Sequence, residues 1–356
     1  MRIMGYRQLW LWAALATPLQ TIASQEGESP RLHLRDSVVL VESESRYVGH
    51  LNGFAISASG RFYVLDVGNI IVHEFASDGR PLRTFGRRGN GPGEFSRPSA
   101  IAIAGDTLLL VHGAGRLQAF DLRSGKYVWE RRLPRRTDGI LAVDGIIYLA
   151  GLDPERRAAL RAATAKDDPV RYTGPYPWPY GGNRMVDDVF SHVQFARLSR
   201  DSAVFGFHAS DYLYYGRIDG AAYDSVRVAR RIRNGARPDL IARMKEDPRL
   251  LQEHAYSLSA PWSVTRLSNG RFAYVTVDQR LLPGRMAGRL HVSVVDPVSK
   301  QTCADAHYPG GEDPPAWPVF RGDTLVVMQQ DEGVDMQPRS IVRKWILDTE
   351  GCRWRR

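Results

Sequence analysis

Four polar residues each end a short apolar run, and their side chains could support metal binding or proton transfer. Asp66, His112, His208 and Gln329 close runs such as FYVLD and VFGFH. Carboxylate and imidazole groups bind divalent metals, and histidine also acts as a general acid or base near neutral pH. A structural alternative stays open, because an aspartate before a Gly-Asn turn commonly accepts hydrogen bonds from the turn's backbone. We favour that structural role for Asp66, which precedes the turn VGN.

A second group of candidate residues is aromatic. Trp262 and Trp317 precede apolar runs, and Tyr176, Trp178 and Tyr180 fall in the irregular segment GPYPWPYGGN. Aromatic side chains grouped on loops favour stacking against sugars, peptides or ring compounds. Alternatively, the tryptophans fill the centre of the fold as core residues. The positions expected to be equivalent to the two tryptophans elsewhere in the chain are Asn52, Ser99, Gly139 and Val193.

The sequence lacks the motifs of common hydrolases. It contains neither the G-x-S-x-G nucleophile elbow nor the H-E-x-x-H zinc motif. Two acidic pairs, Asp187-Asp188 and Glu312-Asp313, have ligand types that suit Ca²⁺, although solvated loop charges are the favoured explanation. We therefore predict no cofactor and no metal site, and leave Ca²⁺ as the open alternative.

A repeat of short strands must position these residues. Each unit has about four apolar runs joined by turns, and a ring of such units buries faces that one unit alone cannot. This pattern predicts an all-β fold, a six-bladed β-propeller. The second strands expected in the six blades are Phe62–Asp66, Leu108–His112, Ile146–Ala150, Val204–His208, Phe272–Thr276 and Leu325–Gln329.

Two segments stand outside the repeat. Ser37–Glu42 is an extra strand, and pairing it beside Ile341–Leu347 would close the ring and cover an exposed strand edge. Arg237–Leu258, between blades four and five, predicts two short helices, since Pro238 suits a first helical position and Asp247-Pro248 separates the two. This insertion is either a lid over the ring or a surface addition.

The first blade carries a more specific pattern. The segment DGRPLRTFGRRGNGPGEFSRPSAIAI resembles the repeat of NHL-type six-bladed propellers, especially secreted bacterial ones with a G-x-G-P-G-E-F loop. The resemblance implies the fold more than any activity, because one fold hosts many functions. The residues that carry it are Gly89, Gly91, Pro92, Gly93, Glu94 and Phe95.

Residues 1–24 have the pattern of a secretory signal peptide. Arg2 and Arg7 precede the apolar run Leu9–Ala16, and Thr21-Ile22-Ala23 suits signal cleavage. The run is too short to span a bilayer, although a signal anchor stays as the alternative. We therefore expect residues 25–356 to form a single propeller domain, periplasmic or secreted, monomeric, and free of the membrane after signal removal.

The basic charge does not indicate a nucleic-acid partner. The formal net charge is +9, and the cations are 43 Arg and 5 Lys. The arginines are scattered rather than clustered, so no concentrated basic patch is visible. Such an excess of arginine over lysine typically reflects codon composition rather than a phosphate-binding surface.

The two cysteines, Cys303 and Cys352, predict a disulfide between the fourth strand of blade five and the C-terminal tail. An even pair in an oxidising compartment favours this bond. Two free buried thiols are the alternative.

These observations lead to two functional hypotheses. The first is an exported binding or scaffold protein that recognises a peptide, glycan or protein partner on the loop face of the propeller. The second is a metal-dependent enzyme of the lactonase or lyase type with its site on the central channel. The predicted ligand-binding residues are Trp262, Trp317, Trp178, Tyr176, Tyr180, His112, His208, Asp66 and Gln329.

Overall fold

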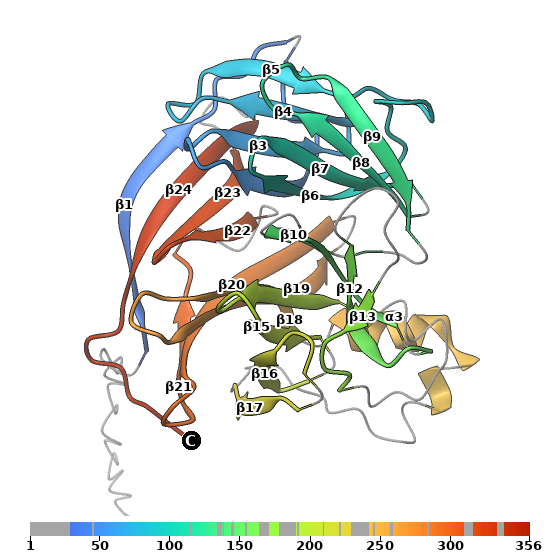
Figure 1. Cartoon of the computed structure of the whole chain (residues 1–356). Helices are drawn as coiled ribbons and strands as arrows, with labels where there is room; N and C mark the ends of the chain where they lie inside the picture. Colours follow the sequence, from blue (N-terminus) through green and yellow to red (C-terminus); the bar gives the residue numbers. More distant parts are fainter. Residues whose placement is uncertain are drawn as a thin grey trace, which may run out of the picture.

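The computed structural model is an all-β, six-bladed propeller built from six four-stranded antiparallel sheets (Figure 1). The predicted number of blades is confirmed. The structure describes residues 29–356 except 45, 114, 134–136, 138, 144–145, 154, 164–170, 178–189, 191, 209, 221, 229–241, 245, 257–258, 283–284, 310–315 and 333–337. The predicted signal peptide, residues 1–24, lies outside the described residues.

The four strands of each blade follow one another from the axis to the rim. Blade one contains β2 (Leu51–Ile56), β3 (Phe62–Asp66), β4 (Ile71–Phe75) and β5 (Pro81–Phe85). Blade two contains β6 (Pro98–Ala104), β7 (Thr107–His112), β8 (Arg116–Asp121) and β9 (Tyr127–Arg132). Blade three contains β10 (Gly139–Val143), β11 (Ile146–Asp153), β12 (Ala158–Ala163) and β13 (Arg171–Thr173). Blade four contains β14 (Val193–Arg197), β15 (Ser202–Phe207), β16 (Tyr212–Arg217) and β17 (Asp224–Arg227). Blade five contains β18 (Ser259–Arg266), β19 (Phe272–Leu282), β20 (Arg285–Asp296) and β21 (Gln301–His307). Blade six contains β22 (Ala316–Arg321), β23 (Thr324–Glu332), β24 (Pro338–Asp348) and β1 (Arg31–Val39).

The N-terminal strand closes the ring, as predicted. β1 pairs antiparallel with β24, with Leu34 opposite Trp345 and Val38 opposite Val342. The strand starts at Arg31 and ends at Val39, so it lies earlier in the chain than the predicted Ser37–Glu42. Because β24 finds its fourth-strand partner at the other end of the chain, the closure joins the two ends of the fold.

The turn between β4 and β5 depends on a glycine. Gly79 has φ 86°, and a Cβ at this position would lie 2.2 Å from Val39 O. The Val41 N–H also donates to Gly79 O at 2.9 Å. The predicted Asp-Gly turn therefore holds the segment after β1 against blade one.

The core consists of layers between neighbouring blades. Each of six buried clusters combines apolar side chains from two successive blades, including the pair formed by blades six and one. Val64 and Met328, for example, belong to the same cluster although they stand at opposite ends of the chain. The innermost strands also contact their neighbours all the way round the ring. Burial between blades therefore drives closure of the ring.

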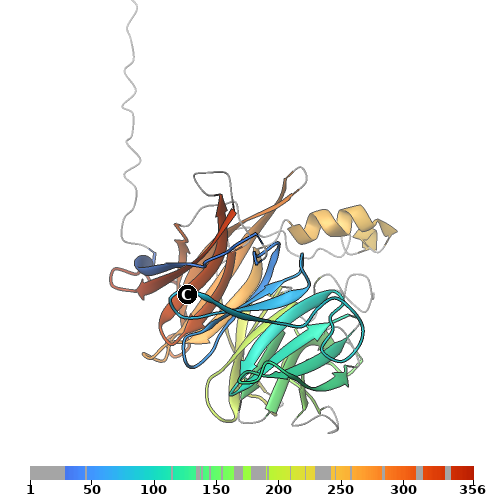
Figure 2. The same cartoon turned by 90° about the horizontal axis from the view of Figure 1, so that it is seen from above.

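An insertion and two long hairpins extend one side of the ring (Figure 2). α3 (Pro248–Tyr256) lies between β17 and β18, within the predicted insertion, and residues 242–244 are also helical. The β19–β20 and β23–β24 hairpins run past the predicted strand ends at Thr276 and Gln329. Among the described residues, no helix has the length and apolar character to cross a membrane.

The glycine-rich loop after β5 is folded onto blade two. Glu94 accepts hydrogen bonds from the backbone of Asn90 and Gly91 and pairs with Arg87 at 2.9 Å. Phe95 is fully buried, and a Cβ on Gly86 would lie 2.1 Å from its ring. This arrangement explains the G-x-G-P-G-E-F pattern. The glutamate accepts hydrogen bonds from the backbone of its own loop, and the phenylalanine packs in the core.

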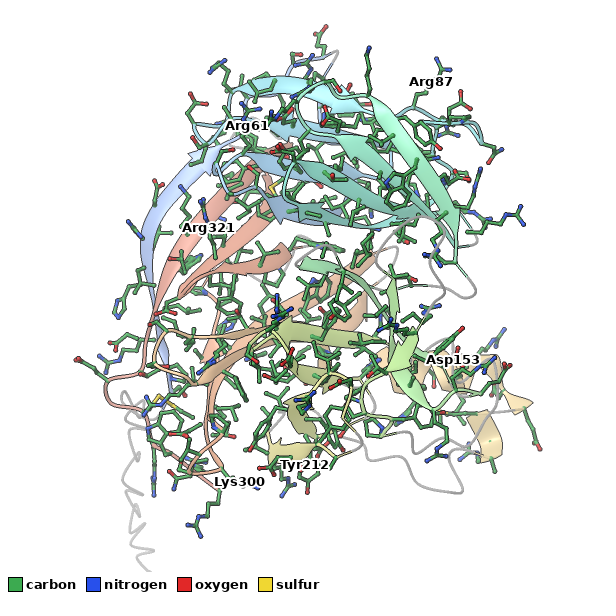
Figure 3. The ribbon with its side chains drawn as sticks, in the orientation of Figure 1. Arg61, Arg87, Asp153, Tyr212, Lys300 and Arg321 are labelled. Atoms are coloured by element: carbon green, nitrogen blue, oxygen red, sulfur yellow. A yellow bond between two sulfur atoms is a disulfide. The ribbon has the colours of Figure 1, made fainter. Side chains whose placement is uncertain are left out.

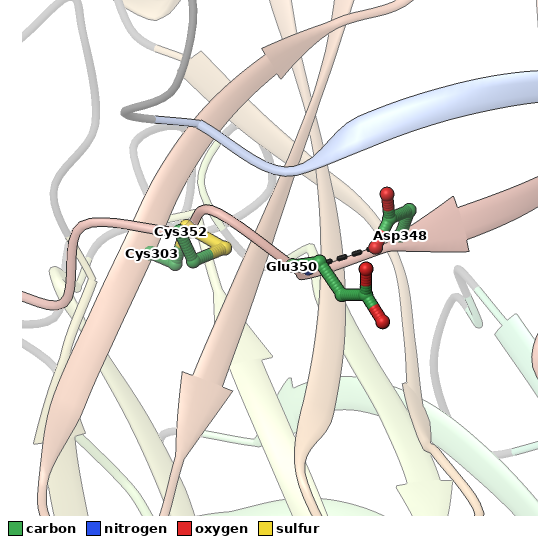
Figure 4. The surroundings of a disulfide bond; sticks show 4 residues. All are labelled: Cys303, Asp348, Glu350 and Cys352. Carbon is green, nitrogen blue, oxygen red and sulfur yellow. Dashed lines mark hydrogen bonds between the residues drawn. A yellow bond between two sulfur atoms is a disulfide. The ribbon is translucent and has the colours of Figure 1, made fainter.

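The Cys303–Cys352 disulfide is present, with a Cα–Cα distance of 5.7 Å (Figure 4). Just before the bond, Asp348 Oδ1 accepts a hydrogen bond from the Glu350 N–H at 2.7 Å. The tail then pairs with the edge of β21, because Thr302 and Arg355 exchange two backbone hydrogen bonds. Trp354 lies under Arg271, 4.3 Å from guanidinium carbon to ring centroid. The disulfide prediction is confirmed.

Candidate ligand-binding site

The propeller has two distinct faces. The starts of innermost strands and the ends of second strands share one face, since Leu51 pairs with Asp66 and Pro98 pairs with His112. We call this the channel face, and the side that carries the turns between first and second strands the turn face. In Figure 3, Arg61 and Arg321 lie on the turn face. Arg87 and Asp153 lie on the opposite, channel face (Figure 3).

A cavity of about 390 Å³ occupies the centre of the ring and is lined by all six innermost strands or their entries. None of the described residues that line it is an acid, a lysine or an arginine. The polar lining residues are Asn52, Ser99, Thr137, His192, Gln194 and Ser263, and aromatic surface comes from Trp262 and Trp317. A concave site with a few converging polar groups and aromatic walls suits a small or elongated uncharged ligand.

Three of these side chains sit at β-bulges. The pairing register shifts between Leu51 and Gly53, which leaves Asn52 without a partner residue on β3. The same shift isolates Ser99 in β6 and Trp262 in β18. A bulge bends a strand locally and redirects its side chain. Asn52, Ser99 and Trp262 all line the channel at these bulges.

Trp262 and Trp317 meet edge to face at the channel. Their ring centroids are 5.0 Å apart at an interplanar angle of 87°. Both side chains are partly exposed, and each also packs against a core cluster between blades. Their location agrees with the sequence-based expectation, and they combine exposed aromatic surface with a core contact. The edge-to-face contact fixes the orientation of both rings.

Thr137 was missed by the sequence analysis. It is fully buried, lines the cavity just before β10, and accepts a hydrogen bond from Arg161 Nη2 at 3.0 Å. Arg161, in β12, is only 1% exposed, so a guanidinium group lies directly behind the channel wall. Since the Thr137 oxygen accepts this bond, its hydroxyl proton can be donated to another acceptor. Nothing in the local sequence distinguishes Thr137 from an ordinary loop threonine.

The prediction that Val193 lies at the channel, in the position equivalent to the two tryptophans, is wrong by one residue. Val193 is buried in the core cluster between blades three and four, and its neighbours His192 and Gln194 line the cavity instead. Successive residues of a strand point to opposite sides, so a shift of one residue exchanges core and channel. The polar–apolar–polar order of these three residues is the signal that could have located them.

Asp66 supports the backbone of the channel face. Its carboxylate accepts hydrogen bonds from the N–H groups of Gly49, His50, Gly68 and Asn69, at 2.8–3.1 Å. His73 Nε2 lies 3.1 Å from Asp66 Oδ2. Burial alone would raise the pKa of Asp66, but the His73 and backbone hydrogen bonds outweigh it and hold the pKa well below its usual range. The structural interpretation of Asp66 fits this arrangement.

We expect Asp66 to make stability depend on pH in the acid range. Because its native pKa lies below the unfolded value of about 3.9, the charged group stabilises the fold at higher pH, and this stabilisation is lost as the pH falls below about 5. The stability difference between the wild type and Asp66→Asn, measured by urea unfolding, should therefore shrink from pH 7 to pH 3. Asp78→Asn, at an exposed turn of the same blade, is the control. A difference that stays constant with pH would contradict this role.

His112 is enclosed by the glycine-rich loop. It is fully buried, its ring centroid lies 5.8 Å from that of Phe95, and its Nδ1 accepts a long hydrogen bond from the Ser96 N–H at 3.4 Å. Burial lowers the pKa of His112, and the nearby Arg116 charge lowers it further. The imidazole is therefore neutral near pH 7 and belongs to the support of the loop.

His208 and Gln329 are also buried one strand away from the axis. His208 packs against Phe190, with ring centroids 5.3 Å apart, and Phe190 also contacts His254 of α3 at 5.7 Å. This stack attaches the helical insertion to blade four. Gln329 accepts a hydrogen bond from the Tyr308 hydroxyl at 2.5 Å and donates one to Asp331.

The remaining predicted residues are only partly within the described structure. Tyr176 packs against the core cluster of blades three and four, and Arg157 stacks on its ring at 5.2 Å. Trp178 and Tyr180, and the acidic pairs at 187–188 and 312–313, lie outside the described residues. Within the described part of the chain, no three His, Cys, Asp or Glu side chains are grouped as metal ligands. The structure thus brings Trp262 and Trp317 together at the channel and places Asp66, His112, His208 and Gln329 in supporting positions.

Comparison with known proteins agrees with this class of fold. A family model described as a 6-bladed beta-propeller, DUF5128, matches residues 40–149, which cover blades one and two and the start of blade three. No curated protein matches the chain.

Two solved structures are similar over most of the chain. A member of the DUF4221 family from Bacteroides vulgatus has a TM-score of 0.63 and 11% identity, covering 91% of this chain and 99% of its own. A protein described as exported, from Bacteroides fragilis, has a TM-score of 0.61 and 11% identity, covering 88% of this chain and 94% of its own. At these identities the likeness shows the six-bladed fold.

Proposed function

We propose that this protein is an exported binding propeller whose central cavity holds an uncharged, polar ligand, and that the ligand is a glycan. The observation that carries the proposal is the convergence of three bulged residues, Asn52, Ser99 and Trp262, on one cavity. Bulges cost regular pairing and recur next to functional sites. Three of them in separate blades, all lining one cavity, favour a ligand site over a filled core.

The chemistry of the lining favours a sugar. The side-chain amides of Asn52 and Gln194 can each donate and accept hydrogen bonds, as the hydroxyl groups of a sugar require. The partly exposed ring of Trp262 offers an apolar surface for the face of a pyranose. None of the described lining residues is an acid, a lysine or an arginine, so nothing among them calls for a charged group on the ligand.

The contacts of the buried polar residues favour binding over the metal-dependent enzyme. Asp66, His112, His208 and Gln329 all engage protein groups one strand outside the cavity wall. A catalytic metal on the axis would need several of these side chains to converge on the channel.

We also infer export to the periplasm or the cell exterior, and descent from the NHL-type secreted propellers. The signal-like residues 1–24 and the disulfide support export, since disulfides persist in oxidising compartments. The similar structure from Bacteroides fragilis, described as exported, supports it as well. The G-x-G-P-G-E-F loop of blade one supports the NHL-type assignment.

We expect Trp262→Ala to weaken glycan binding at least tenfold, because it removes the stacking surface, and Trp317→Ala to weaken it less. The probe is an array of neutral and acidic oligosaccharides, followed by calorimetry with the best neutral binder. Trp354→Ala is the matched control, because this tryptophan packs under Arg271 beside the tail and away from the cavity. Equal affinities for Trp262→Ala and the wild type, or binding of acidic oligosaccharides only, would contradict the proposal.

A further inference from the structure

A second cavity opens on the turn face, at the seam where the ring closes. Its volume is about 390 Å³, and it is formed by β1 and β24, the turn after β22, and blade one. It is separate from the channel, because none of its lining residues also lines the central cavity. Arg321, labelled in Figure 3, stands at the start of the turn between β22 and β23.

The seam cavity has an excess of positive charge. Arg35, Arg321 and Lys344 line it together with a single acid, Asp36. Lys344 Nζ pairs with Asp36 at 2.7 Å, so these two charges offset each other. Among the described residues, neither Arg35 nor Arg321 forms an ion pair with an acid. Two guanidinium groups are therefore left to attract an anion.

Arg321 is held in place by the neighbouring blade. Its Nη2 donates to Ala58 O at 2.7 Å, across the seam between blades six and one. A Cβ on Gly60 would lie 3.2 Å from Arg321 Nη1, so the glycine leaves room for the guanidinium. A guanidinium fixed by one backbone contact keeps its other N–H groups for an oxyanion, and it loses less side-chain entropy on binding.

The floor of the seam cavity is apolar. Ile56, Phe62 and Val326 line it, Phe62 and Val326 being almost fully buried, and Ser77 and Thr324 add hydroxyl groups to the lining. An apolar floor suits the carbon skeleton of an organic ligand.

We propose that the seam cavity binds a small organic anion. The arginines Arg35 and Arg321 take its oxyanion group, a carboxylate or a phosphate, and its short carbon skeleton lies on Phe62 and Val326. The site spans the N-terminal strand, blade six and blade one, so its occupant stabilises the closed ring. A ligand that binds only the folded state raises the melting temperature with concentration.

The test measures thermal shift and calorimetric binding with succinate, inorganic phosphate and the neutral analogue succinamide, all at constant ionic strength. We expect saturable binding of succinate or phosphate, no binding of succinamide, and at least a tenfold loss of affinity in Arg35→Gln and in Arg321→Gln. The preference between succinate and phosphate identifies the oxyanion. The Arg35 side chain makes no hydrogen bond to the other described residues, so its variant keeps the test valid even if Arg321→Gln unfolds.

Arg80→Gln is the matched control, since Arg80 is an exposed arginine in the turn between β4 and β5, on the same face. It should bind like the wild type. Trp262→Ala should also leave anion binding intact, which separates this site from the glycan site. The proposal is overturned if no anion saturates at constant ionic strength, or if Arg80→Gln weakens binding as much as Arg35→Gln.

Discussion

Replacing Phe95 by alanine should lower the free energy of unfolding by about 3–5 kcal/mol, the usual range for removing a buried phenylalanine. Phe95 is fully buried and meets the ring of Phe120 edge to face, with centroids 5.5 Å apart. Its cavity would not collapse easily, because the loop around it is held separately by the hydrogen bonds of Glu94. Urea unfolding measures the loss.

Arg88→Ala is the control for this experiment, because Arg88 is an exposed residue of the same loop. It should change stability by less than about 0.5 kcal/mol. Amide hydrogen exchange of the loop should become faster in Phe95→Ala and stay unchanged in Arg88→Ala. A loss below about 1 kcal/mol for Phe95→Ala would mean that the loop is not anchored through this side chain.

Removing the disulfide with Cys303→Ala and Cys352→Ala together should cost about 4 kcal/mol by the chain-entropy estimate. The two cysteines have a sequence separation of 49. The loop that the bond closes contains β22, β23 and β24, the three strands that the C-terminal part of the chain contributes to blade six. Breaking the bond raises the conformational entropy of the unfolded chain much more than that of the folded one. Urea unfolding of the double variant, compared with the oxidised wild type, gives the value.

The reduced wild type is the control for the disulfide, and it should match the double variant. The tail should stay partly docked without the bond, because Thr302 and Arg355 still pair and Trp354 still packs under Arg271. Equal stability of the oxidised and reduced wild type would contradict a stabilising role for the bond.

The repeat was predictable because its signals are local. Apolar runs of a few residues, separated by turns such as Asp78-Gly79, locate the strands wherever a hairpin follows directly. The lengths of the strands in blades five and six were not predictable. β19 and β20 stay paired as far as Leu282 and Arg285, beyond Thr276, where the predicted second strand of blade five ends. Pairing with a neighbouring strand, rather than local sequence, extends them.

The candidate site was only partly predictable. The tryptophans were located correctly because bulky aromatics at the start of two innermost strands are conspicuous, but Val193 was assigned to the channel although it faces the core. β2, β6 and β18 each have a bulge at this level, whereas β14 pairs with β15 in regular register from Val193 onward, so its first residue faces the core. A bulge is set by the partner strand, which sequence alone does not specify.

The sequence by itself determined the six-bladed ring, its closure by an N-terminal strand and the partners in the disulfide, since each follows from short-range patterns or from the one pair that two cysteines can form. Only the tertiary structure decided what the polar residues do. Asp66 and His112 have the side chains of a metal site, yet the fold surrounds Asp66 with backbone N–H groups and packs the glycine-rich loop over His112. Arg35, Arg321 and Lys344 are far apart in the chain and ordinary in sequence, yet ring closure brings them to one cavity. The physical reason is that hydrogen bonding and charge act through space, and proximity in space is set by the packing of blades that the local sequence does not encode.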